Sequence, residues 1–186
     1  IEIINQYGLD PLRYYLIKEV SFGNDGNISQ ERLEDCINSD LANNFGNLCQ
    51  RVTAFAIKNC NGKIPENISF NKDDLKILDK FKINLNLIRD KIDKQDVNYY
   101  IDFIVNTLFD TNKYFNDQEP WKKKNDMSRL NTIVYTTLEI VRKISYMLYP
   151  IIPQSSLNAL KIFSINEKDI SLDSLENHLY LKGNEK

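Results

Sequence analysis

Several features that would identify common classes of protein are missing from this 186-residue sequence. No run approaches the ~18 consecutive apolar residues of a membrane-spanning helix. Neither a signal peptide nor a basic transit sequence is recognisable at the start, IEIINQYGLD. The only histidine is His178, so a histidine-based catalytic triad elsewhere in the chain is excluded. Because the sequence starts without a methionine, we expect the chain to be a segment of a longer protein.

Cysteines and phosphate-binding glycines are also scarce. The three cysteines, Cys36, Cys49 and Cys60, form no CxxC motif and no cysteine–histidine spacing, so we expect neither a zinc site nor a disulfide framework. We interpret them as small apolar helix residues in a reducing compartment. A glycine-rich loop of the GxGxxG or GxxxxGK type is absent, which leaves nucleotide binding without support. Because no carboxylates lie at metal-ligand spacing and no nucleophile has an identifiable base, the residues favour a binding module over a catalyst.

Neither sign of charge is in large excess, since the net charge is −2 at pH 7 and charged residues make up 27% of the chain. Such a balance produces no global field that would draw the chain onto nucleic acid or an anionic membrane. Any contact with nucleic acid therefore requires a local patch. Hydrophobic residues make up 42%, which is enough for one sizeable core, alone or with a small appendage.

Apolar residues recur at intervals of three, four or seven, and this spacing predicts α-helices. We expect a short helix that ends before Gly8, then a helix with Asp10 as N-cap and Pro11 in its first turn. Ser29 is expected to cap the next helix, and Pro153 to start the last one. The longer helices are expected at residues 30–59, 72–91, 96–115 and 128–149. Since no strand alternation occurs, we predict an all-α helix bundle of about five to six helices with short connections.

Two polar residues lie four apart in the stretch LANNFGNLCQRV and share one face of the long helix. They are Asn47 and Arg51. An amide beside a guanidinium offers fixed donors and an acceptor that can read the edge of a base. The alternative is an ordinary solvated pair, or an asparagine that caps a neighbouring loop. Another polar pair, Asp73 and Asp74, is explained by the favourable position of carboxylates at the start of a helix.

The only tryptophan, Trp121, follows Pro120 within the polar stretch NDQEPWKKKND. One interpretation is an aromatic side chain that closes one end of the bundle and donates its indole N–H to a carbonyl. The other is a stacking platform for an unpaired base, with Pro120 stiffening the backbone before it. In that case the following lysines, Lys122, Lys123 and Lys124, contact phosphates. A run of lysines is also typical of a solvated face.

Five stretches occur in an order that matches a known family: YGLDPLRYYLIKEVSFGNDGNIS, DLANNFGNLCQRV, NGKIP, TNKYFNDQEPWKKK and LYPIIPQSS. Together, over about residues 1–162, they resemble the part of methionyl-tRNA synthetases that follows the catalytic domain. These enzymes are class I aminoacyl-tRNA synthetases. The resemblance implies connecting helices at 1–28, a helical anticodon-binding domain at 29–162 and a C-terminal tail at 163–186. No HIGH-like or KMSKS-like catalytic string and no zinc-binding insertion is present.

The resemblance implies that this segment recognises the methionine anticodon CAU and so supports ATP-dependent charging of tRNA(Met) for translation. It assigns anticodon contacts to Asn47 and Arg51, stacking on the first anticodon base to Trp121, and the shape of the loop to Pro120. It implies no cofactor and no metal in this segment, and ATP with Mg for the catalytic domain of the parent ligase. Without that domain the segment is expected to be inactive.

The implied partners are the anticodon loop of tRNA(Met) and the catalytic domain of the same polypeptide, with no membrane and no DNA, in the cytoplasm. Two other functions stay open from the sequence. One is the anticodon-binding domain of another class I synthetase. The other is a helical protein-interaction bundle in which Trp121 is an interface anchor.

Overall fold

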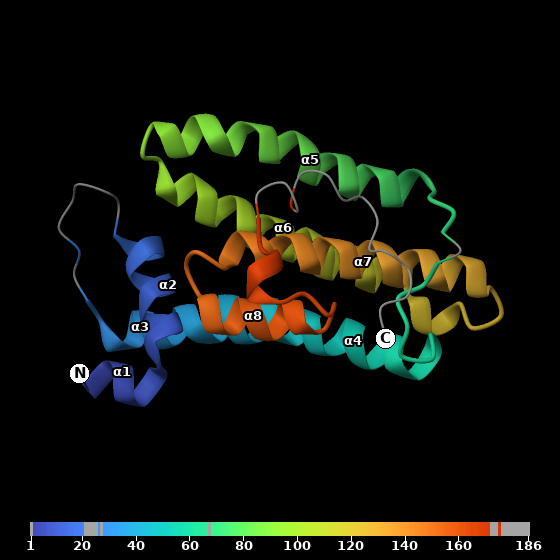
Figure 1. Cartoon of the computed structure of the whole chain (residues 1–186), viewed down its shortest axis with the longest axis horizontal. Helices are drawn as coiled ribbons and strands as arrows, with labels where there is room; N and C mark the ends of the chain where they lie inside the picture. Colours follow the sequence, from blue (N-terminus) through green and yellow to red (C-terminus); the bar gives the residue numbers. More distant parts are fainter. Residues whose placement is uncertain (1, 21–25, 27, 67, 172–174, 176–186) are drawn as a thin grey trace.

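Helix α7 (Met127–Leu148) lies at the centre of the chain (Figure 1). The structure, a computed structural model, describes residues 2–20, 26, 28–66, 68–171 and 175, and within residues 83–86 it describes the backbone but not the side chains. Every residue of α7 from Thr132 onward is buried. The reason is that α4, α5, α6 and α8 all pack against it.

The described residues form helices and no strand, which confirms the all-α prediction. The α-helices are α1 (Glu2–Tyr7), α2 (Leu9–Glu19), α3 (Gln30–Cys36), α4 (Asn47–Asn59), α5 (Lys72–Asp93), α6 (Val97–Gln118), α7 (Met127–Leu148) and α8 (Pro153–Lys161). Shorter elements are the π-helical stretch η1 (Ile37–Gly46) and the 3-10 turns η2 (Pro120–Lys122) and η3 (Glu167–Asp169). Of the helices described, none combines the length and apolarity that crossing a membrane requires.

The long helix predicted at residues 30–59 is present, but its middle is π-helical rather than α-helical. Gly46 sits where the wide turn closes, and a Cβ atom there would lie only 3.1 Å from the carbonyl oxygen of Leu41. From α6, Asn112 donates from Nδ2 to the backbone oxygen and the side-chain oxygen of Asn44, at 3.2 and 2.8 Å. Hydrogen bonds from α6 therefore stabilise the π-helical segment η1. The spacing of apolar residues within the segment cannot reveal such a contact, because its partner lies far away in the sequence.

The expected cap of the second helix is wrong. Helix α2 begins at Leu9, one residue before Asp10, and Gly8 occupies the N-cap with φ 88°. The carboxylate of Asp10 instead accepts a 2.7 Å hydrogen bond from the backbone N–H of Ser155 in α8. Arg13 adds two 2.7 Å bonds to the carbonyl oxygens of residues 150 and 151. Helix α2 is thus fastened to the turn between α7 and α8.

The tail is partly described. Phe163 is buried, and Tyr149 donates to Glu167 at 2.6 Å, which ties the short turn η3 to the end of α7. Leu175 is also buried. His178 lies outside the described residues.

Candidate nucleic-acid interface

A tight turn between α6 and α7 carries Trp121. Helix α6 ends at Gln118, and Glu119 then adopts a left-handed conformation, with φ 45° and ψ 59°. The reversal allows Pro120 to start the 3-10 turn η2, where Pro120 is buried. Trp121 follows and is 40% exposed. The turn between α6 and α7 lies at the end of the bundle opposite the α5–α6 turn (Figure 1).

The indole of Trp121 packs against the buried ring of Phe115 from α6. The two ring centroids are 6.2 Å apart at an interplanar angle of 68°. Phe55 from α4 packs on the same ring edge-to-face at 5.9 Å. Such aromatic pairs contribute roughly 0.5–1.5 kcal/mol each beyond the area they bury. Trp121 thus closes this end of the bundle with part of its surface, and the rest of the side chain remains exposed.

Arg51 lies on the same phenylalanine. Its guanidinium carbon is 5.6 Å from the centroid of Phe115. Its Nη2 donates a 2.6 Å hydrogen bond to Oδ1 of Asn116, the next residue of α6. The sequence does not single out these two neighbours, because Phe115 looks like an ordinary apolar residue of the predicted helix and Asn116 like one more residue of the polar stretch that follows it. The fold therefore joins Arg51 and Trp121 through one ring.

Asn47 is the first residue of α4 and is exposed one turn before Arg51. The structure places the two on one face of α4, as their spacing predicts. The lysines of the turn, residues 122–124, are all exposed. Lys122 forms a 2.7 Å ion pair with Glu119. That pair neutralises part of the charge of the run.

A buried ionic network holds the turn in place. Asp74, near the start of α5, is fully buried and receives both terminal nitrogens of Arg129 from α7, at 2.5 and 2.9 Å. Tyr114 from α6 donates to the same carboxylate. Arg129 also donates to Gln118 at 2.6 Å, and Gln118 is the last residue before the turn. Burial, followed by the hydrogen bond to Asp74, raises the pKa of Tyr114.

Asp73 and Asp74 lie in the first turn of α5, as the sequence predicts, and the network adds partners for Asp74 that the sequence does not show. Asp74 does complete a capping box with Asn71, a signal that the sequence carries in the spacing N-x-x-D. Its other partners, Tyr114 and Arg129, are distant in sequence, so local patterns give no sign of them. Their effect is to join the beginning of α5, the end of α6 and the beginning of α7 around the Trp121 turn.

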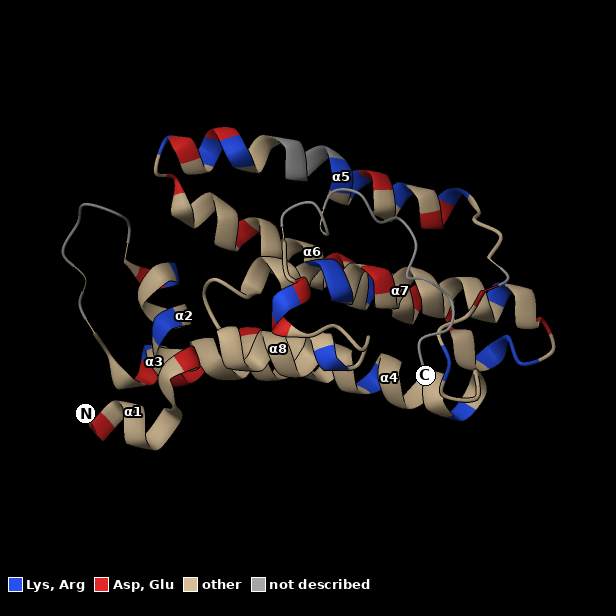
Figure 2. Cartoon of the chain, viewed as in Figure 1, with Lys and Arg blue, Asp and Glu red and all other residues tan. Residues whose placement is uncertain are grey.

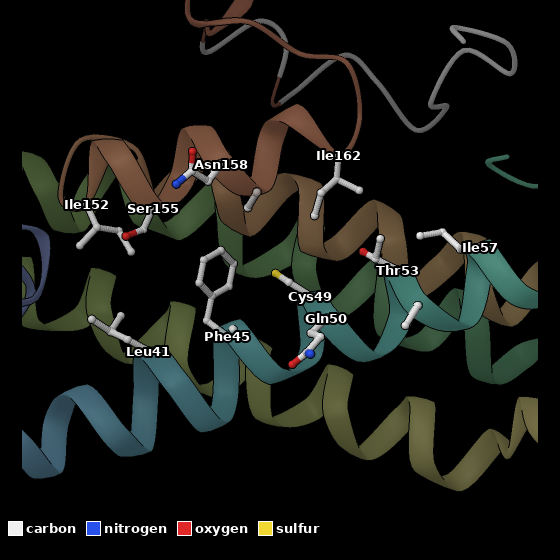
Figure 3. Close-up of a pocket in the computed structure, with 13 residues that line it drawn as sticks. Leu41, Phe45, Cys49, Gln50, Thr53, Ile57, Ile152, Ser155, Asn158 and Ile162 are labelled. Carbon is white, nitrogen blue, oxygen red and sulfur yellow. The ribbon is translucent and has the colours of Figure 1, made fainter. Parts of the chain in front are cut away.

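A separate groove of about 610 Å³ runs between the η1–α4 helix and α8 (Figure 3). Cys49 and Thr53 line it, and both lie on the side of α4 away from Arg51 because residues two apart differ by about 200° on a helix. Burial raises the pKa of the Cys49 thiol to about 12, which keeps it protonated and unreactive. Burial also raises the pKa of Cys36, to about 11. These thiols behave as small apolar residues.

Metal-binding side chains do not cluster among the described residues. In the part of the chain that the structure describes, no three His, Cys, Asp or Glu residues gather closely enough to hold a metal ion. The carboxylate of Asp74 is already engaged by Arg129 and Tyr114.

The comparisons with known proteins agree on one family. A family model described as tRNA synthetases class I (M) matches residues 1–53. The methionine–tRNA ligase of Brucella suis biovar 1 is 40% identical over 165 residues, which cover 88% of this chain and 32% of that protein. The methionine–tRNA ligase of Thermotoga maritima is 38% identical over 181 residues, which cover 96% of this chain and 29% of that protein.

A solved structure gives the same result. The crystal structure of the apo form of Mycobacterium tuberculosis methionyl-tRNA synthetase superimposes with a TM-score of 0.90 at 32% sequence identity, and covers 96% of this chain and 37% of that one. The chain spans about a third of the length of the curated relatives it matches. The chain therefore belongs to the methionine–tRNA ligase family, as a segment about one third as long as those relatives.

Proposed function

We propose that this segment recognises the anticodon CAU of tRNA(Met) and so selects the tRNA that the whole ligase charges. In this proposal residues 1–28 connect to the catalytic part, residues 29–162 read the anticodon, and residues 163–186 form a tail. ATP and Mg act in the part of the protein that lies outside this segment. The partners are the anticodon loop and the catalytic part of the same polypeptide.

The observation that carries the proposal is the shared ring of Phe115, which holds a partly exposed Trp121 and the guanidinium of Arg51 in one cluster. An exposed indole can stack on any unpaired base, and such stacking is worth about 1–3 kcal/mol per base. Stacking alone does not distinguish one base from another. A neighbouring set of hydrogen-bonding groups is therefore needed for selection.

Asn47 and Arg51 supply that set. A guanidinium has five N–H donors, so the bond from Arg51 to Asn116 can orient it while further donors face a base. The amide of Asn47 adds both a donor and an acceptor on the same exposed face. A wrong base leaves these groups unpaired, at a cost of about 1–3 kcal/mol for each mismatch. The packed bundle fixes the distance between the platform and the reading groups.

The test is binding of the whole 186-residue chain to RNA stem-loops that carry CAU or one changed anticodon base. We expect the dissociation constant to rise by about 5- to 150-fold for a change at a base that Asn47, Arg51 and Trp121 contact, since 1.4 kcal/mol is tenfold. Equal binding to every loop would refute anticodon recognition. Complete absence of RNA binding would favour a protein-interaction surface around Trp121 instead.

A further inference from the structure

Residues 41–65 contain no aspartate or glutamate, although the whole sequence has 26 acidic residues. This stretch covers the end of η1, all of α4 and the segment that leaves it. Its charged residues are Arg51, Lys58 and Lys63, all positive. Exposed carboxylates repel phosphates, so their absence over such a length makes this side of the bundle receptive to a polyanion.

The basic residues continue the face that carries the proposed base-reading groups. Asn47, Arg51 and Lys58 stand at intervals of four and seven, which places them in one row along α4. With a rise of about 1.5 Å per residue, Lys58 lies about 10 Å beyond Arg51 along the helix axis. Lys58 and Lys63 are both exposed. A strand that leaves the reading groups along this row therefore meets Lys58 next.

The lysine run of the Trp121 turn is a weaker candidate for phosphate binding. Lys122 pairs with Glu119 at 2.7 Å, and on the last turns of α6 Lys113 pairs with Asp117 at 2.9 Å. Asp126 adds another negative charge where α7 begins. Figure 2 shows a blue stretch followed by red on the turn between α6 and α7, while the blue bands on α4 have no red between them. Lys58 and Lys63 thus lie in a stretch without carboxylates, whereas Lys122 is paired with Glu119.

We propose that Lys58 and Lys63 bind backbone phosphates of the RNA whose unpaired bases reach Asn47, Arg51 and Trp121, and that they supply more of the salt-dependent affinity than Lys122 does. The proposal rests on the proposed function, since the same RNA must occupy the reading groups. The lysines position the RNA strand and carry no base preference, because a phosphate is the same for every base.

The experiment measures the dissociation constant of the CAU stem-loop at several salt concentrations for the wild-type chain, Lys58→Gln, Lys63→Gln and the double variant. For single-stranded RNA each lost phosphate contact makes the slope of log K against log salt less steep by about 0.7. We expect that change for each single variant and about twice that change for the pair. The ratio of affinities for CAU and for a changed loop stays as in wild type.

Two further Lys→Gln variants serve as controls. Lys122→Gln removes a lysine of the Trp121 turn that Glu119 already neutralises. Lys94→Gln removes an exposed lysine at the α5–α6 turn, at the opposite end of the molecule (Figure 1). Lys94→Gln is expected to leave the slope within the experimental error of wild type, and Lys122→Gln to change it less than Lys58→Gln or Lys63→Gln does. Thermal unfolding of each variant checks that the substitution has not simply unfolded α4, whose C-terminus a lysine also favours through the helix dipole.

The outcomes separate the two proposals. A wild-type slope in the Lys58→Gln and Lys63→Gln variants, with CAU still preferred, overturns the phosphate assignment and leaves anticodon recognition intact. If Lys122→Gln changes the slope of log K against log salt as much as Lys58→Gln or Lys63→Gln does, the claim that Lys58 and Lys63 supply more of the salt-dependent affinity is overturned. Loss of the CAU preference in Lys58→Gln would place this residue among the base-reading groups and would also overturn the assignment. A wild-type chain without CAU preference refutes the proposed function itself.

Discussion

Replacing Arg129 with methionine removes the guanidinium from the buried carboxylate of Asp74 and keeps an apolar stem in its place. Asp74 is fully buried, and the Arg129 side chain is only 15% exposed. Removing one partner of a buried ion pair costs about 3–5 kcal/mol, because the other charge stays buried without compensation. We expect the low end, about 3 kcal/mol, since Tyr114 and the backbone N–H of Asn71 still donate to Asp74.

Circular dichroism during heating measures the effect. For a chain of this length each kcal/mol lowers the melting temperature by about 2–4 °C, so Arg129→Met is expected to melt about 6–12 °C below wild type. The matched control is Arg32→Met, because Arg32 pairs with Glu19 at 3.5 Å on the exposed surface. Exposed pairs contribute about 0–1 kcal/mol. The control is expected to melt within about 4 °C of wild type.

A double variant sharpens the test. Asp74→Asn removes the negative charge, so adding it to Arg129→Met relieves the uncompensated carboxylate. The two substitutions are therefore expected to be less damaging together than the sum of their separate effects, with a coupling of at least about 1 kcal/mol. If Arg129→Met melts as the Arg32→Met control does, or if the effects are simply additive, the network does not hold the turn as described.

The remaining predictions concern the platform and the thiols. Trp121→Ala is expected to weaken binding to the CAU stem-loop by about 1–3 kcal/mol, and more than Lys123→Ala, a neighbour of the same turn; the reverse order in a binding titration would mean that charge rather than stacking dominates. Because burial raises the pKa of Cys49 to about 12 from 9.0, the unfolded chain releases this proton from about pH 9 upward while the folded chain retains it. The free energy of unfolding is thus expected to fall between pH 9 and about pH 12. Urea titrations at several pH values check this, and Cys49→Ala is expected to show a shallower fall. An unchanged slope in that variant would contradict the burial argument.

Apolar spacing and end signals predict the helices well. The N-cap at Ser29 is confirmed, since its hydroxyl accepts the backbone N–H of Arg32, and Pro153 begins α8 as expected. The starts of α5 and α7 fall within one residue of the predicted positions. These signals work because they depend on neighbours only a few residues away. The helix order and the all-α class follow from the same local information.

The features that the sequence does not reveal depend on contacts between residues far apart in the chain. The π-helical segment is braced by Asn112, which lies more than sixty residues from Asn44. Asp74 is surrounded by side chains forty and fifty-five residues away. Among the candidate site residues, the spacing of Asn47 and Arg51 predicts their shared face. The contact between Arg51 and the Trp121 cluster requires the fold, because α4 and α6 meet only when the bundle closes.

The shared ring of Phe115 couples the positions of two exposed groups to one buried side chain. Phe115 is 2% exposed, so it cannot itself touch a bound RNA, yet it supports both the indole of Trp121 and the guanidinium of Arg51. A change of side-chain shape at this position displaces both groups at once. Under the proposed function, a change of anticodon preference can therefore start from buried positions, Phe115 and its neighbour Phe55, as well as from residues on the surface.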